Sequence, residues 1–294
     1  MKALTAITDY DPIIKLVLDT ITSNETKRKY QAALRDFIAW VASGSTQGLD
    51  RAVVQSYKAM MLKDGIGGIS IRLAAIKKLA YEAYQNELIS HRHYMGIKDI
   101  KNPRMEGRKV GNWLTKKEAI AVLRKPDTDT LKGLRDRAIL AVFLGAGLRR
   151  SEAASLTFEH VQQREGRWVI VDLVGKRNKV RTIPIASWVY HAIQSWSEAA
   201  GLESGNVFVS LNKGGHITGT SMSAQALRDV SVKFAGLPPH DLRRTHAKLA
   251  HAGHADILQI SLSLGHESVE TTQKYIGIEQ DFTNSPSDKL GLRL

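Results

Sequence analysis

The chain has 294 residues, 43% of them hydrophobic, so it holds enough apolar material for two globular domains. It contains no cysteine, which excludes disulfides and thiolate chemistry and removes most zinc-finger motifs. Lys and Arg outnumber Asp and Glu by 42 to 29, giving a net charge of +13 at pH 7. This balance favours a nucleic-acid partner, and a merely basic soluble protein is the alternative.

The first domain is predicted to be a bundle of helices over residues 1–105. Apolar residues recur at 3.6-residue spacing over 30–41, 50–62 and 73–84, as on the buried faces of packed helices. Basic residues off these faces either lie in solvent or contact phosphate, and spacing alone leaves both possibilities open. The candidate DNA contacts among them are Lys27, Arg28, Arg72 and Lys77.

A linker is predicted to follow the first domain. Residues 96–112 contain three glycines, a proline and five basic residues with little apolar content, which is typical of an exposed connection. We place the basic linker itself at 106–112 and the second domain at 113–294. Arg108 and Lys109 are candidate DNA contacts.

The second domain is predicted to be mainly helical, with one small antiparallel β-sheet. Thr115 and Glu118 form a capping box, and an apolar helix over 134–144 ends at glycines. Two segments rich in β-branched residues flank the turn at 175–179, which indicates a β-hairpin with a lysine-rich tip. Further helices are expected at 187–199, 223–234, 240–252, 256–264 and 269–275.

Six polar side chains in the second half of the chain suit the metal-free cleavage of a phosphodiester. They are Arg149, Lys176, His240, Arg243, His266 and Tyr275. Arginines can neutralise the phosphate, lysine and histidines can move protons, and a tyrosine can attack phosphorus. No single member is persuasive, so the local context of each has to decide.

The first two candidates lie at a helix start and at a hairpin tip. Arg149 follows a glycine-rich turn, where an arginine can bind phosphate, with Glu152 one turn later; a surface Arg–Glu pair is the alternative. Lys176 can protonate the leaving 5′-oxygen, although a solvated turn lysine is equally compatible with its position. Arg177 and Lys179 compete with it for that role and are also candidate DNA contacts.

The other four candidates lie on the last helices. His240 and Arg243 are three residues apart on one helical face, which lets them reach one spot; a capped helix start is the alternative. His266 follows a glycine at the end of an apolar helix. Tyr275 would ordinarily be a packing residue, and its phenol, with a pKa near ~10, needs a base or cationic surroundings to react.

Metal and nucleotide chemistry have no support in the sequence. His246, His251 and His254 cluster on one helix, but no H-E-x-x-H motif accompanies them. No Walker-type phosphate loop occurs. We therefore expect neither a metal nor a cofactor.

Four segments carry a resemblance to a known family. They are GAGLRRSEAASL, VGKRNKVRTIPI, HDLRRTHAKLA and SLGHESVETTQKYIG. In order and spacing they resemble the tyrosine recombinase (phage integrase) family over residues 112–280, and the first domain looks like that family's core-binding domain. The resemblance implies these roles: Tyr275 as the nucleophile that forms a 3′-phosphotyrosyl link, Arg149 and Arg243 as the phosphate clamp, Lys176 as the general acid, His240 and His266 as the motif histidines, and Glu152 as the supporting acid.

The resemblance also implies partners. Family members clamp double-stranded DNA at a specific site and assemble as tetramers, and their C-terminal helix docks on a neighbour. The chain continues only briefly after Tyr275 and contains Pro286 there, so a long exchanged helix is not expected. Nor do we expect an N-terminal arm-binding domain. Thr245-His246 departs from the family's frequent Thr-Phe, from which we expect altered packing, and Arg244 beside it is a candidate DNA contact.

The expected function is site-specific recombination that integrates, excises or resolves DNA. A type IB topoisomerase activity, chromosome-dimer resolution and a non-catalytic DNA-binding regulator are the alternatives. No stretch approaches the ~20 apolar residues of a membrane span. The first ten residues lack a signal-peptide pattern. We therefore expect a cytoplasmic, nucleoid-associated protein that could be monomeric when free of DNA.

Overall fold

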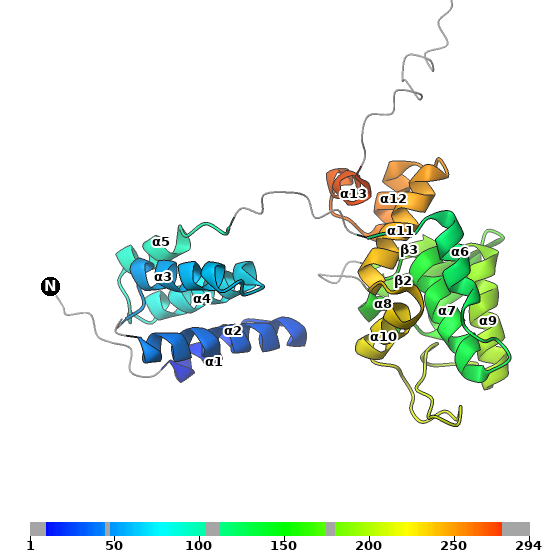
Figure 1. Cartoon of the computed structure of the whole chain (residues 1–294), viewed down its shortest axis with the longest axis horizontal. Coiled ribbons are helices and arrows are strands. Elements are labelled where there is room, and N and C mark those ends of the chain that lie inside the picture. Colours follow the sequence, from blue (N-terminus) through cyan, green and yellow to red (C-terminus); the bar gives the residue numbers. More distant parts are fainter. Residues whose placement is uncertain (1–9, 45–47, 104–111, 175–179, 278–294) are drawn as a thin grey trace, which may run out of the picture. The chain divides into compact units, whose positions relative to one another are not determined.

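The computed structural model describes residues 10–44, 48–103, 112–174 and 180–277. The chain divides into two compact units, Met1–Arg108 and Lys109–Leu294 (Figure 1). Each unit has its own hydrophobic core. Among the described residues no helix is long and apolar enough to cross a membrane.

The first unit is built of helices around a central one, α4. Its elements are α1 (Asp11–Asp19), α2 (Asn24–Ser43), α3 (Arg51–Lys63), α4 (Ile69–Gln85) and α5 (His91–Lys98). Side-chain caps begin three of them, because Ser23 accepts the Thr26 N–H, Asp50 accepts the Val53 N–H and Ser90 accepts the His93 N–H. Helix α4 contacts the other four and buries Leu73, Ile76 and Leu79 completely. A bundle is therefore the architecture of this unit.

The predicted linker begins later than residue 96. Gly96 lies inside α5, and Ile97 and Ile100 are buried in the core of the first unit. Burial of these two side chains is the reason the chain stays folded here despite its glycine and lysines. Of the proposed linker 106–112, all but residue 112 lies outside the described residues, as do Arg108 and Lys109.

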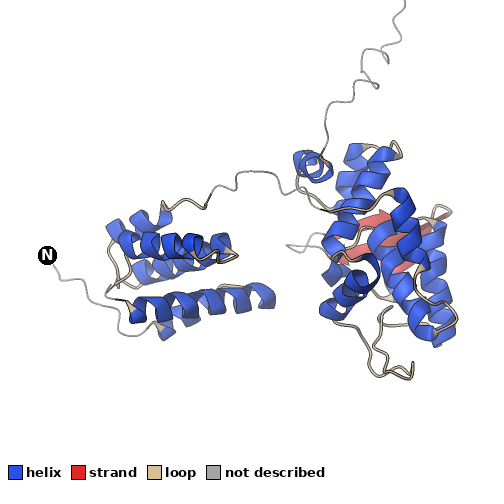
Figure 2. Cartoon of the chain, viewed as in Figure 1, coloured by secondary structure: helices blue, strands red, loops and turns tan. Residues whose placement is uncertain are grey.

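The second unit packs helices around a three-stranded antiparallel sheet (Figure 2). Its strands are β1 (Val161–Arg164), β2 (Arg167–Val174) and β3 (Val180–Pro184), in that order across the sheet. Its helices are α6 (Lys116–Arg124), α7 (Leu131–Gly145), α8 (Arg150–Ala154), α9 (Ser187–Ala200), α10 (Ala224–Ala235), α11 (Pro239–Ala252), α12 (Ile257–Leu264) and α13 (Val269–Ile276), with a 3₁₀ turn at Phe158–His160. The predicted fold class, mainly α with a small antiparallel sheet, is confirmed.

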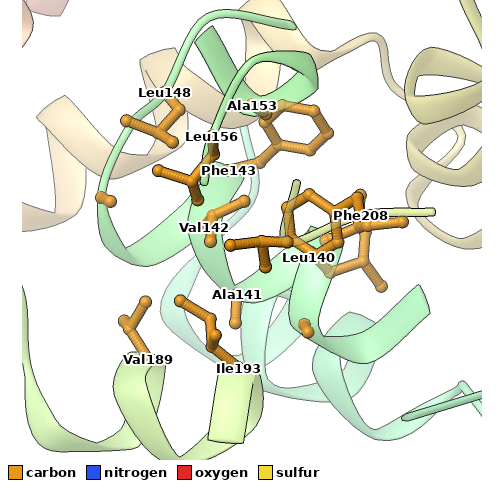
Figure 3. Close-up of a cluster of buried hydrophobic side chains, with 14 of the residues drawn as sticks. Leu140, Ala141, Val142, Phe143, Leu148, Ala153, Leu156, Val189, Ile193 and Phe208 are labelled. Atoms are coloured by element: carbon orange, nitrogen blue, oxygen red, sulfur yellow. The ribbon is translucent and has the colours of Figure 1, made fainter. Parts of the chain in front are cut away.

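Helix α7 forms the centre of the second core. Every residue from Ala138 to Leu144 is buried, and α6, α8, α9, α10 and α11 all contact this helix. Ala141 lies on the side of α7 toward Val189 and Ile193 of α9 (Figure 3). Gly145 permits the approach of α9, because a Cβ there would lie 2.3 Å from Val189 Cγ2. Arg149 follows the end of α7 by four residues, so the packing of α7 in the core positions the backbone of this candidate residue.

Candidate active site

Five of the six candidate residues lie in one region of the second unit. Arg149 immediately precedes α8, His240 and Arg243 lie on α11, His266 lies between α12 and α13, and Tyr275 lies on α13. A cavity of about 330 Å³ is lined by Arg149, Arg150, Ser151, Arg228, Pro238, Pro239, His240 and Arg243. Segments separated by more than 100 residues of sequence thus bring their side chains together.

Glu152 is the buried anion of this region. Its carboxylate accepts the Arg149 N–H at 2.7 Å and an N–H of the Arg149 guanidinium at 2.7 Å. It also accepts two N–H groups of Arg181, each at 2.8 Å. Burial raises the pKa of Glu152, but these hydrogen bonds and charges outweigh burial and lower the pKa to about 2. The surface Arg–Glu pair considered from the sequence is therefore wrong, since the Glu152 side chain is only 1% exposed.

Arg243 is held by backbone carbonyls. Its guanidinium donates to the carbonyls of Gly147 and Leu264, and its side chain is 2% exposed. Burial, with the charge of Arg149 next, lowers the pKa of Arg243 to about 10, so the group is still a cation at neutral pH. Gly147 has φ +60, which glycine adopts without strain, and this turn presents its carbonyl to Arg243.

His266 is kept neutral by its surroundings. Burial, followed by the charges of Arg243 and Arg149, lowers its pKa to about 4. Its Nδ1 lies 2.8 Å from the hydroxyl of Thr272, a residue with no exposed surface. Burial and the charge of Arg244 also lower the pKa of His240. Both imidazoles can therefore accept a proton near neutral pH.

Tyr275 lies between the two histidines. Its ring centroid is 5.3 Å from that of His240 and 5.3 Å from that of His266, in edge-on geometry. Its hydroxyl donates to the His240 carbonyl at 2.9 Å, and the Arg244 guanidinium lies 5.0 Å from the ring centre. Burial raises the pKa of Tyr275, while Arg243 and Arg244 oppose the rise. The phenol is therefore protonated at neutral pH.

The remaining candidate residues are placed less directly. Lys176, Arg177 and Lys179 lie outside the described residues. Arg72 donates to Asp36 at 2.7 Å and to the Tyr57 hydroxyl at 3.3 Å, so its guanidinium is engaged within the first unit.

Four further DNA-contact candidates can be located. Lys27 lies 3.8 Å from Asp19, Arg28 is exposed and Lys77 is half-buried. Arg244 donates to Asp241 at 3.2 Å beside the Tyr275 ring. A DNA contact by any of these residues stays a prediction.

Arg181 is the site residue that the sequence analysis missed. It lies on β3, its side chain is 10% exposed, and besides Glu152 it binds the Ser263 carbonyl at 2.9 Å. Its strand had been considered only as one arm of a hairpin. A basic residue between Val180 and Ile183 in so short a strand was the available signal.

His246 and His251 lie on α11, but His254 follows the end of that helix with φ +63, so the prediction of three histidines on one helix is wrong. Within the described residues no group of three potential metal ligands lies together. His246 instead packs against the glycine turn. Its Nδ1 lies 2.9 Å from the Leu144 carbonyl, and a Cβ on Gly147 would lie 2.9 Å from its ring. The Thr245-His246 departure from the frequent Thr-Phe is thus accommodated by packing.

The fold and this collection of residues define a class of DNA-processing proteins. Residues 112–281 match the phage integrase family, and the chain belongs to this family, the tyrosine recombinases, which cleave and rejoin DNA. The predicted resemblance is confirmed.

Similar proteins span nearly the whole chain. Tyrosine recombinase XerC of Myxococcus xanthus is 30% identical over 269 residues, covering 86% of this chain and 87% of that protein. XerC of Pelobacter propionicus is 29% identical over 282 residues, covering 91% and 89%. The structure of the Tn1549 transposon integrase in complex with transposon right-end DNA has a TM-score of 0.67 at 16% identity, covering 94% of this chain and 98% of that chain. At this identity the structural likeness shows the fold alone.

Proposed function

We propose that this chain is a site-specific DNA recombinase in which Tyr275 cuts one strand and holds it as a 3′-phosphotyrosine. The observation that carries the proposal is the position of the Tyr275 hydroxyl, on a ring that lies between His240 and His266. Arg149 and Arg243 line the adjacent cavity. A nucleophile, proton acceptors and phosphate ligands thus come from one region.

The reaction balances without a cofactor. The Tyr275 oxygen bonds to phosphorus, and the bond from phosphorus to the 5′-oxygen breaks. Rejoining reverses the exchange with a second 5′-hydroxyl, so one phosphodiester replaces another and no external energy source is needed. In the DNA-free structure the hydroxyl donates to the His240 carbonyl, and we infer that it exchanges this partner for the phosphate.

The protons have assignable routes. The phenol of Tyr275 is protonated at neutral pH, and a neutral imidazole of His240 or His266 can take its proton. The leaving 5′-oxygen needs a proton, which we assign to Lys176.

The arginines stabilise the charge that develops at phosphorus. Arg149 and Arg243 would bind the non-bridging oxygens, whose negative charge is greater in the pentacoordinate state than in the ground state. Because Arg243 is already fixed by two carbonyls, this stabilisation requires little reorganisation during the reaction.

Duplex DNA with a defined site is the proposed substrate, bound by a homo-oligomer that we expect to be a tetramer. We expect the protein to act in the cytoplasm beside the nucleoid. Resolution of chromosome dimers is a second candidate, favoured by the XerC relatives that span 86–91% of this chain, and integration of a mobile element is the alternative. Recombination between two sites on one plasmid, compared with recombination between sites on separate plasmids, would distinguish them.

Replacement of the nucleophile tests the proposal. Footprinting first locates the recombination site. Incubated with a nicked duplex that carries this site, the wild-type chain should form a covalent adduct that survives SDS. Tyr275→Phe should bind DNA as tightly but form none, because it lacks the attacking oxygen. Tyr190→Phe is the matched control, since Tyr190 stacks on Trp168 instead of lying at the cavity. Adducts formed by Tyr275→Phe would refute the assignment, and ATP-free relaxation of any supercoiled plasmid would favour the topoisomerase alternative.

A further inference from the structure

Three arginines share the C-terminal end of helix α12. The Ser263 carbonyl accepts from Arg181, the Leu264 carbonyl from Arg243 and the Gly265 carbonyl from Arg149. Three consecutive carbonyls thus each bind a different guanidinium. The last carbonyls of a helix have no partner within the helix and carry its negative dipole, so they suit cations. Arg149 and Arg243 have roles in the proposed function, whereas Arg181 has none.

Arg181 also occupies two of the hydrogen-bond acceptor sites on the Glu152 carboxylate. The guanidinium of Arg181 spans both carboxylate oxygens of Glu152, each at 2.8 Å. Arg149 meets the same carboxylate through its backbone N–H and a single guanidinium nitrogen, NH1, at 2.7 Å each. A carboxylate has about four acceptor sites, so these four hydrogen bonds fill it. The other N–H groups of the Arg149 guanidinium are thereby kept from Glu152.

We propose that Arg181 is a positioning residue, which occupies Glu152 so that the Arg149 guanidinium remains available to the scissile phosphate. Without Arg181, two acceptor sites on Glu152 become vacant. Arg149 could then turn its second nitrogen to them and form a bidentate pair, the geometry that arginine and carboxylate prefer. Glu152 would then compete with the phosphate. This inference rests on the proposed function.

The packing around Arg181 fits this role and makes it specific to arginine. A Cβ added to Gly265 would lie 3.0 Å from Arg181 Cδ, so the stem passes close under the turn that precedes His266. Lysine carries one ammonium and cannot span both Glu152 oxygens while also binding Ser263. Arg181→Lys should therefore keep the charge and lose the positioning.

The rate of the cleavage step measures the effect. Single-turnover cleavage of the nicked duplex is followed with saturating protein, and DNA affinity is measured separately by fluorescence anisotropy. Arg181→Gln should cleave about 10- to 100-fold more slowly, the usual cost of a displaced catalytic group, with affinity changed less than about 3-fold. Arg167→Gln is the matched control, because Arg167 is an exposed arginine at the start of the neighbouring strand. If Arg181→Gln is not folded, Arg181→Lys takes its place.

A neutral phosphate separates positioning from a general structural defect. A duplex with a methylphosphonate at the scissile position lacks one anionic oxygen, so cleavage depends less on Arg149. The ratio of wild-type to Arg181→Gln rates should therefore be at least about 10-fold smaller on one methylphosphonate diastereomer than on the phosphodiester. An equal ratio on all substrates, or wild-type cleavage by Arg181→Gln, would overturn the inference. If the wild-type chain forms no adduct, the proposed function itself fails, which is a distinguishable result.

Discussion

Replacing Glu152 with Gln would retain the shape of the side chain and remove the negative charge shared by Arg149, Arg181 and Arg243. Glu152 accepts four hydrogen bonds from two of these residues and lies 4.0 Å from the guanidinium of the third. An amide has one acceptor oxygen in place of two and adds an NH₂ that faces donors. The variant would therefore leave three guanidiniums close together without their anion.

The size of the loss follows from the pKa. The pKa of Glu152 falls from its ordinary 4.5 to about 2. At about 1.4 kcal/mol per unit, the charged form contributes about 3 kcal/mol to the free energy of unfolding. The side chain is 1% exposed, so solvent screening reduces this little. Removal of one member of a buried ion pair costs a similar ~3–5 kcal/mol. For a domain of this size we expect Tm to fall by about 6–12 °C.

The pH dependence of this loss gives a second check by calorimetry. Because the pKa is depressed in the folded state, the contribution is complete above pH 4.5 and is lost as pH falls toward 2. The difference in Tm between wild type and Glu152→Gln should thus be full at pH 7 and clearly smaller at pH 3.5. A Tm for the second unit within about 1 °C of wild type at pH 7, or a difference independent of pH, would refute the reasoning.

Two further predictions concern His266. Thr272→Val removes the hydroxyl that lies 2.8 Å from Nδ1 of His266, so cleavage should slow about 10-fold at unchanged DNA affinity. Thr272→Ser keeps the hydroxyl and should cleave at the wild-type rate. Equal single-turnover rates for Thr272→Val and the wild-type chain would contradict this prediction. In the DNA-free protein, histidine NMR should show His266 neutral down to a pKa of about 4. Because unfolded histidine binds its proton near pH 6.5, stability should decrease as pH falls from about 6.5 to 4, and a measured pKa near 6.5 would disprove the shift.

The sequence predicted the helices that carry a clear local signal, whereas α1 and α5 were not predicted. The capping box of Thr115 and Glu118 forms as expected, and 3.6-residue spacing located α2, α3 and α4. Strand β1 was missed, since its two glutamines favour no strand. In the structure Glu165 and Gly166, with φ of 50° and 73°, form the turn of the hairpin that joins β1 to β2. This turn was the only sequence signal for that hairpin.

Five of the six candidate residues could be named from the sequence and lie in one region, whereas their contacts could not be predicted. Arg149 and Glu152 are close in sequence, so their pairing could be anticipated. Arg149 and the Gly265 carbonyl are 116 residues apart, and no spacing rule connects them. Arg181 was missed for the same reason, because its partners Glu152 and Ser263 belong to other elements. The start of the linker was misplaced because burial of Ile97 depends on the whole first unit.

The end of α12 shows how a protein can concentrate positive charge without surrounding it with acids. A second or third carboxylate here would stabilise the guanidiniums but would repel an incoming phosphodiester. Peptide carbonyls at a helix end supply partial negative charge that neither titrates nor carries a full unit of repulsion. The cluster can therefore stay assembled before DNA arrives and keep most of its attraction for it. The carbonyls at this helix terminus thus stabilise the three guanidiniums without adding a formal negative charge.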